Sequence, residues 1–232
     1  MSEARVEIIR GNILNVLSEA IVLPANTGLH EGSGVSTAIF QAAGRKKLTE
    51  ACQKIGSCEE GKAVVTPGFD LKADYIIHTV VPRWIDGQHD EYERLCASYL
   101  AALNAADILG CTSVSFPLLG AGNNGYDLGL AFEIAHQTML KFEGRVLNTV
   151  YLVIYGDRAA ELVSGKGINY IELPENYVHK GKAKAASDDA PRKKGAVEQA
   201  IAQAGDFLGK KENWDAMMAL AAKIVELVMI FK

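Results

Sequence analysis

Short apolar runs alternate with segments of helical periodicity along the chain, as far as about residue 163. Strands are expected where the runs are rich in β-branched residues, and helices where apolar residues recur every three or four positions. Several of the expected strands are almost continuously apolar, which is typical of a sheet covered by helices on both faces. The pattern therefore predicts a three-layer α/β domain. The expected strands are 5–11, 20–25, 62–69, 75–81, 113–119 and 149–155, and the expected helices begin at about Gly34 and cover about 90–109 and 127–142.

The composition changes near residue 179. Residues 180–195 are small, charged and aperiodic, which is typical of a linker, and 196–232 have a helical pattern again. We therefore expect a domain over 1–179, a linker and a helical extension. The apolar stretch 214–231 is interrupted by Lys223 and Glu226, and it is shorter than the roughly 20 residues of a membrane span. We expect this stretch to pack on the domain, on a second copy or on a partner protein, and not in a membrane.

Charge is distributed unevenly between these parts. Residues 1–179 hold 14 Lys and Arg against 21 Asp and Glu, whereas 180–232 hold 10 against 7. A protein that binds nucleic acid neutralises several phosphates with clustered Lys and Arg. In the sequence of the domain, only 45–47 forms such a cluster. Nucleic acid is therefore not an expected partner. The N-terminal residues show no secretory signal, so the expected location is cytoplasmic.

The cysteines and histidines do not show the spacing of a familiar metal site. The four cysteines form no C-x-x-C pair, and the five histidines form no H-E-x-x-H motif. We therefore expect no metal and no cofactor. The cysteines, at 52, 58, 96 and 111, are expected to be buried thiols, and His78 is expected to be a core or near-core imidazole.

Two glycine-rich loops stand between an expected strand and an expected helix. One is Gly32-Ser33-Gly34-Val35-Ser36, and the other is "GAGNNGY" at 120–126. Ligands of open α/β sheets bind beyond the carboxyl ends of the strands, and free N–H groups at a helix N-terminus favour an anion. A single loop of this kind is commonly just a tight turn. Two together predict a site for a diphosphate held by peptide donors, without a kinase-like Gly-Lys-Ser/Thr sequence.

Further motifs follow one another in a fixed order along the chain: "RGNI", "AIVLPAN", "GSGVSTAIFQAAG", "CEEGKAVVTPGFDLKADYIIHTVVP" and "SVSFPLLGAGNNGY". Together they resemble the macro domain family, of the Appr-1″-p processing type, which binds ADP-ribose. The resemblance covers about 6–163. It implies a three-layer α/β/α fold with a mixed central sheet of about six strands, and ADP-ribose lying across the strand ends.

The resemblance also implies a set of ligand-binding residues. Asn12, where the family most often has Asp, would meet the adenine amino group, since an amide oxygen can accept that hydrogen bond. Tyr155 would stack on the adenine, although a tyrosine that merely caps a strand at the surface is the alternative. Asn26 would reach a hydroxyl of the distal ribose. The other implied residues are Ile13, Gly32, Ser33, Gly34, Val35, Ser36, Gly120, Ala121, Gly122, Asn123, Asn124, Gly125 and Tyr126.

One departure from the family pattern bears on catalysis. Hydrolytic members of the best-known branch carry Asp two residues after the last glycine of the first loop, and this chain has Ser36 there. A serine hydroxyl does not act as a base near pH 7. The sequence therefore favours a binding module for ADP-ribose, either free or linked to a protein.

Two other hypotheses remain open. The chain could hydrolyse ADP-ribosyl or O-acetyl-ADP-ribose linkages if the phosphate of the substrate orients the water. Asn26, Asn123 or Asn124 would then assist, and Asn26 and Ser36 are the candidate catalytic residues. The domain could also be only a scaffold for partner docking through the helical extension.

Overall fold

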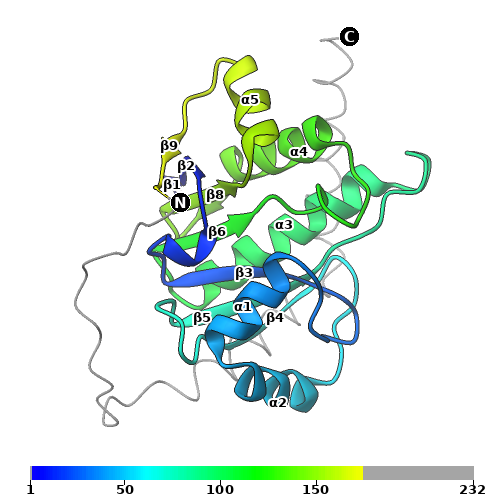
Figure 1. The fold of residues 1–232 in the computed structure, drawn as a ribbon, viewed down its shortest axis with the longest axis vertical. Coiled ribbons are helices and arrows are strands. Elements are labelled where there is room, and N and C mark those ends of the chain that lie inside the picture. The colour runs from blue at the N-terminus through cyan, green and yellow to red at the C-terminus, as the bar shows by residue number, and fades with distance from the viewer. Residues whose placement is uncertain (1, 175–232) are drawn as a thin grey trace.

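The structure, a computed structural model, describes residues 2–174. A seven-stranded sheet forms its centre, in the order β4-β5-β3-β6-β8-β2-β9 (Figure 1). All neighbouring strands in this sheet are parallel except β4 and β5. A separate antiparallel pair joins β1 (Ser2–Glu3) to β7 (Glu143–Gly144). The strands of the large sheet are β2 (Arg5–Arg10), β3 (Ala20–Ala25), β4 (Ala63–Pro67), β5 (Tyr75–Val80), β6 (Ser113–Pro117), β8 (Thr149–Ile154) and β9 (Ile171–Glu172).

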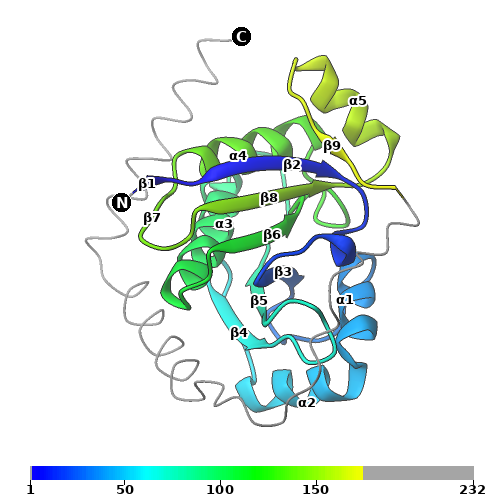
Figure 2. The ribbon, with the colours of Figure 1, turned by 90° about the vertical axis from the view of Figure 1, so that its left-hand side faces the viewer.

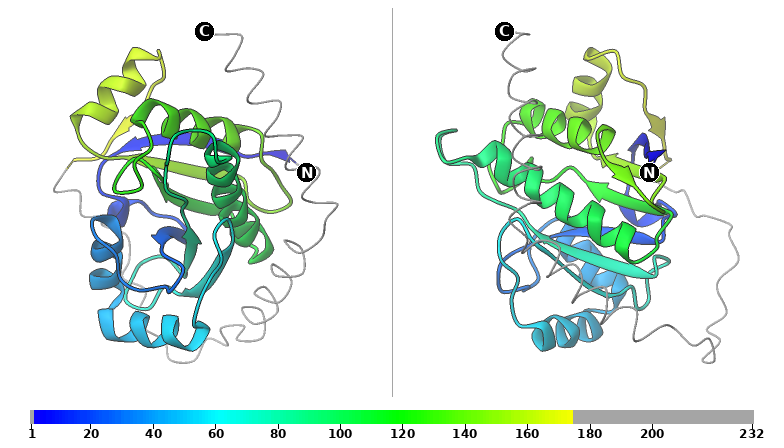
Figure 3. Two further views of the ribbon diagram at one scale, coloured as in Figure 1. Left: turned by 90° about the vertical axis from the view of Figure 1, so that its right-hand side faces the viewer. Right: turned by 180° about the vertical axis from the view of Figure 1, so that it is seen from behind.

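Helices cover both faces of this sheet. The helices α1 (Val35–Ala43) and α2 (Arg45–Ile55) lie in front of it in Figure 1, whereas α3 (Glu91–Ile108) and α4 (Leu128–Leu140) lie in front of it in the view from behind in Figure 3. Each face has its own apolar core, with Phe40 and Leu48 on the first and Phe116 and Phe132 on the second. The predicted three-layer α/β fold is confirmed. The remaining described helices are α5 (Asp157–Gly165) and the short 3-10 helix η1 (Ile13–Asn15).

Burial of the central strands explains why their sequences are so apolar. In β5 and β6 only the first residue is partly exposed, and every later residue is buried. A strand covered on both faces needs apolar side chains at successive positions instead of alternate ones. All six predicted strands are present, with ends that differ by at most two residues from the prediction.

The structure corrects the prediction in three places. The sheet has seven strands instead of about six, because β9 pairs with β2; β9 has only two residues, both exposed, so no apolar pattern indicates it. The helix expected from about Gly34 is divided into α1 and α2, since Gly44 adopts a left-handed conformation between them. Helix α5 was not predicted. Arg10, at the end of β2, forms ion pairs with Asp157 at the start of α5 and with Glu172 in β9.

The predicted linker at 180–195 and the helical extension at 196–232 lie outside the described residues, as does the boundary predicted at 179. Within residues 2–174, no helix combines the length and the apolar character that crossing a membrane requires.

Candidate functional site

The two glycine-rich loops meet at one edge of the sheet. The arrows of β2, β8 and β6 point the same way in Figure 2, and β3 is parallel to β6. The first loop follows β3 and the second follows β6, so both leave the carboxyl ends of neighbouring strands. Asn123 Nδ2 in the second loop donates a hydrogen bond to Ser33 Oγ in the first at 2.6 Å. The structure therefore brings together two segments that are 90 residues apart in sequence.

The second loop presents a row of backbone N–H groups. In the described part of the chain, the N–H groups of Gly120–Asn124 have no protein acceptor. The next two N–H groups, of Gly125 and Tyr126, close the turn on the carbonyls of Gly122 and Gly120, each at 3.2 Å. Successive free N–H groups in a turn of this kind bind anions. The loop can therefore hold a negatively charged group without a basic side chain.

The first loop adds the N-terminus of α1. Gly34 precedes this nine-residue helix with φ of 61°, and no side chain caps it. The N–H groups of Gly34 and Val35 have no acceptor among residues 2–174. The positive end of the helix dipole and these free donors both favour an anion. The one acidic side chain in this loop, Glu31, is paired with Arg45 through Nε–Oε2 at 2.7 Å and Nη2–Oε1 at 3.0 Å, so its charge is compensated.

Ser36 and Gly32 are parts of the frame of the first loop. Ser36 is only 3 % exposed, and its Oγ accepts a hydrogen bond from the Gly32 N–H at 3.0 Å. Thr37 Oγ1 donates to the Gly32 carbonyl at 2.6 Å. The Gly32 N–H is thus already engaged and is not one of the free donors. Ser36 Oγ keeps a hydroxyl hydrogen, so its predicted contact with a water or a ligand stays a prediction.

Two predicted asparagines have structural partners. The Asn26 amide closes a turn, donating to the His30 carbonyl at 2.8 Å and accepting from the His30 N–H at 3.0 Å. The Asn124 Nδ2 donates to the carbonyls of Val81 and Pro82, each at 2.9 Å, and so uses both of its hydrogens. Asn124 therefore ties the second loop to the segment after β5. Asn26 retains one hydrogen and one lone pair for the predicted ribose contact.

Tyr126 is also a support of the second loop. It is buried, and its hydroxyl donates to the Glu91 carbonyl at 2.7 Å. Its ring packs edge-on against Trp84, with 5.3 Å between the ring centroids. The prediction placed Tyr126 in contact with the ligand, but these contacts turn its polar atom toward α3.

The other end of the site lies where β2 and β8 end. Tyr155 follows β8 directly and is 82 % exposed, so its ring is free to stack on a flat ligand. Beside it, the Gly11 N–H donates to the Ile154 carbonyl at 3.0 Å. Asn12 caps η1, with its Oδ1 accepting from the Leu14 N–H at 3.0 Å. The side chain of Ile13 is buried, so only its backbone can meet a ligand.

The segment between β5 and α3 contains side chains that the sequence pattern did not identify as a group. Asp86, His89 and Glu91 are a group of three possible metal ligands in the described residues, and His89 and Glu91 have the H-x-E spacing. His89 Nδ1 is 2.9 Å from Asp86 Oδ1. Burial disfavours the charge of Glu91, yet backbone N–H donors of its own loop outweigh this and lower its pKa to about 2. These hydrogen bonds make Glu91 a structural centre of the loop, and they occupy its carboxylate.

The predicted burial of the thiols and of His78 is confirmed. All four cysteines are buried and free, and burial raises the pKa of Cys52, Cys58 and Cys96 to about 11 and that of Cys111 to about 12. Thiols held in this form are poor nucleophiles. His78 is fully buried in β5, with Nε2 at 2.9 Å from Thr66 Oγ1, and burial lowers its pKa to about 4.

Burial of His78 predicts a loss of stability in acid. The unfolded chain protonates this imidazole near its ordinary pKa of 6.5, while the folded protein keeps it neutral down to about pH 4. The unfolded state therefore binds more protons across this window, and stability falls as the pH falls through it. We expect His78 to account for about 2 kcal/mol of the unfolding free energy lost between pH 7 and pH 5.

Urea unfolding of wild type and His78→Gln at pH 7 and at pH 5 measures how much of the lost unfolding free energy is due to His78. The variant is expected to lose less stability than wild type on acidification, whatever its stability at pH 7. Equal losses in the two proteins would contradict the assignment.

Comparison with known proteins gives consistent matches. A family model described as "Macro domain" matches residues 22–135. A macro domain-containing protein from Listeria monocytogenes is 43 % identical over 140 residues, which cover 59 % of this chain and 80 % of that protein. An O-acetyl-ADP-ribose deacetylase from Escherichia fergusonii is 37 % identical over 166 residues, with coverage of 69 % and 93 %. A mutant macrodomain from Oceanobacillus iheyensis, solved with ADPR, has a TM-score of 0.66 and 33 % identity, with coverage of 71 % and 92 %.

Proposed function

Because this chain belongs to the macro domain family, we propose that it binds ADP-ribose, free or attached to a protein, where its two glycine-rich loops meet. The observation that carries the proposal is the row of N–H groups from Gly120 to Asn124, which have no acceptor within residues 2–174 and are joined to the first loop by the Asn123–Ser33 hydrogen bond. The solved relative with ADPR supports the choice of ligand. Peptide donors explain how a domain with an excess of acidic residues accepts a diphosphate.

The strand ends on either side of the loops indicate where the adenine and the distal ribose of the ligand would lie. The exposed ring of Tyr155 offers a stacking surface for the adenine, and Asn12 lies on the adjacent strand end. The distal ribose then lies at the other side, near Asn26 and the start of α1. In this arrangement the side chains set the position of the base and the ribose, while the backbone holds the diphosphate.

A second candidate function is hydrolysis of the O-acetyl ester of ADP-ribose. The observation in its favour is a relative of 37 % identity, 93 % of which is covered, named O-acetyl-ADP-ribose deacetylase. Against a fast reaction stands Ser36, which is buried and has no acid–base equilibrium near neutral pH. Binding is therefore proposed as the main function, with slow, substrate-assisted hydrolysis as the alternative.

Calorimetric titration of the full chain with ADP-ribose tests the proposal. We expect a dissociation constant in the micromolar range or tighter, corresponding to about −8 kcal/mol or stronger. A folded protein that gives neither heat nor a thermal shift with ADP-ribose would contradict both candidate functions. Incubation with mono-ADP-ribosylated protein, and separately with O-acetyl-ADP-ribose, then measures turnover.

A further inference from the structure

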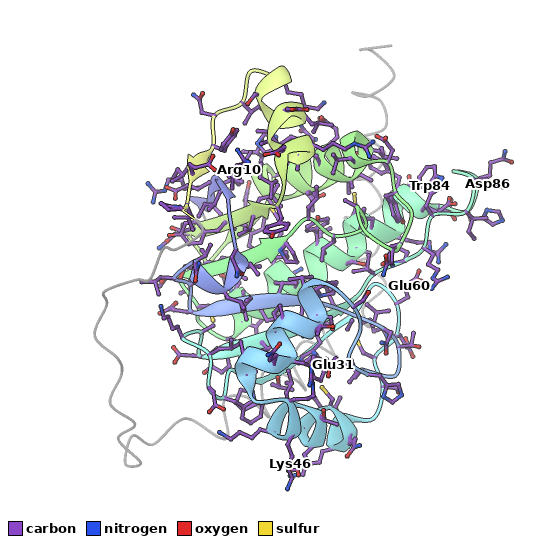
Figure 4. The ribbon with its side chains drawn as sticks, viewed as in Figure 1. Arg10, Glu31, Lys46, Glu60, Trp84 and Asp86 are labelled. Atoms are coloured by element: carbon purple, nitrogen blue, oxygen red, sulfur yellow. The ribbon has the colours of Figure 1, made fainter. Side chains whose placement is uncertain are left out.

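The carboxylate of Glu91 holds together the loop that precedes α3. Glu91 is 1 % exposed, although it begins a helix next to an exposed loop. Its Oε1 accepts hydrogen bonds from the N–H groups of Ile85 (3.0 Å), Asp86 (3.0 Å) and Gly87 (3.1 Å), and its Oε2 accepts one from His89 (2.7 Å). In Figure 4 this loop projects from the domain, with Asp86 at its outer part. A single buried side chain therefore satisfies four backbone donors of a projecting loop.

The same loop also contacts the second glycine-rich loop, through hydrogen bonds and a ring contact. The Trp84 N–H donates to the Asn124 carbonyl at 2.8 Å, and Asn124 Nδ2 returns two hydrogen bonds to Val81 and Pro82. Tyr126 donates to the Glu91 carbonyl and packs against the Trp84 ring. The second loop is thus joined at both Asn124 and Tyr126 to the segment that Glu91 organises.

We propose that Glu91 is a positioning residue for ADP-ribose, which acts by holding loop 84–90 as a brace for the row of N–H groups at Gly120–Asn124. The proposal rests on the proposed function. Ordering a flexible turn when the ligand binds costs free energy and weakens the affinity. A turn that is already ordered in the free protein avoids this cost. Without the Glu91 carboxylate, loop 84–90 becomes more mobile, and so do the N–H groups of Gly120–Asn124 that it supports. These groups must then be ordered when ADP-ribose binds, which lowers the affinity for ADP-ribose.

The first test compares Glu91→Gln with Asp107→Asn. The glutamine keeps the size of the side chain but places an NH₂ group where one carboxylate oxygen accepted a backbone N–H. Asp107 provides a matched control: it is 8 % exposed, and its Oδ1 accepts the N–H groups of Arg145 (2.9 Å), Val146 (2.7 Å) and Leu147 (2.9 Å). It lies about 24 Å farther along the same helix, beside the start of β8 instead of the strand ends that carry the site.

Calorimetry with ADP-ribose is expected to separate the two variants. Both lose stability, since in each an acceptor shared by several backbone N–H groups is replaced. Only Glu91→Gln is expected to bind ADP-ribose about 10-fold more weakly, while Asp107→Asn stays within about twofold of wild type. Equal weakening in both variants, or wild-type affinity in Glu91→Gln, overturns the positioning role. Should Glu91→Gln not fold, Trp84→Leu removes the ring contact and keeps the carboxylate, and the same weakening is expected.

A second readout needs no ligand and distinguishes failure of the brace from failure of the proposed function. The chain has two tryptophans, so a Trp214→Phe background leaves Trp84 as the sole tryptophan, and its emission can be excited selectively over that of the eight tyrosines. Glu91→Gln is expected to increase the access of a soluble quencher to Trp84, and Asp107→Asn is expected to leave it unchanged. Glu91→Gln is also expected to speed amide exchange at least 10-fold at Trp84, Gly125 and Tyr126, whose N–H groups are hydrogen-bonded, and Asp107→Asn to leave it unchanged. No change in Glu91→Gln refutes the brace. A wild-type protein that fails to bind ADP-ribose refutes the proposed function, whatever these measurements show.

Discussion

Replacing Gly122 with glutamate is expected to weaken ADP-ribose binding at least 100-fold. Gly122 stands in the middle of the N–H row, and its backbone is not in the left-handed region. A Cβ added there would meet no atom of the described residues within 4 Å, so the described domain tolerates a side chain at this position. The glutamate would instead enter the space proposed for the diphosphate and repel its charges.

Gly165→Glu is the matched control for that experiment. Among the described residues Gly165 also has open space around its Cβ and no positive φ, and it is the last residue of α5 and belongs to neither glycine-rich loop. Both variants are expected to unfold at nearly the same temperature as wild type, and only Gly122→Glu to lose binding in a calorimetric titration. Binding within threefold of wild type in Gly122→Glu would show that the diphosphate does not lie in the second loop.

Introducing aspartate at position 36 is expected to raise hydrolytic turnover at least 10-fold. Ser36 is the second residue of α1, where the helix dipole stabilises a carboxylate. Its Oγ accepts the Gly32 N–H, and one carboxylate oxygen can take over that bond while the other faces a water. A well-placed general base contributes about 10²- to 10⁴-fold, so even imperfect geometry should give a measurable gain.

Turnover of O-acetyl-ADP-ribose and of mono-ADP-ribosylated protein by wild type, Ser36→Asp and Ser36→Asn checks this expectation. The asparagine matches the size of aspartate without its basicity and should give no gain. Affinity for ADP-ribose must be measured in the same variants, because an added negative charge can also repel the diphosphate. Rapid turnover by wild type that Ser36→Ala leaves unchanged would mean that the catalytic water lies elsewhere.

Local sequence patterns were sufficient for the fold class and for the two glycine-rich loops that follow its strands. The apolar run of β3 was predicted with its exact bounds, Ala20–Ala25, because a strand buried on both faces leaves a continuous apolar signal. The two glycine-rich loops were found because a turn that exposes its N–H groups before a helix requires residues with little or no side chain. Both signals are contained in a few consecutive residues.

The sequence by itself therefore determined the α/β class, the six main strands and the two glycine-rich loops. Only the tertiary structure decided that Asn124 and Tyr126 hold the second loop in place, and that Glu91 organises the loop behind it. The two-residue strand β9 also depends on its pairing with β2. The physical reason is common to these cases: a polar side chain or a short strand takes its role from a partner, and that partner is chosen by the packing of the whole domain.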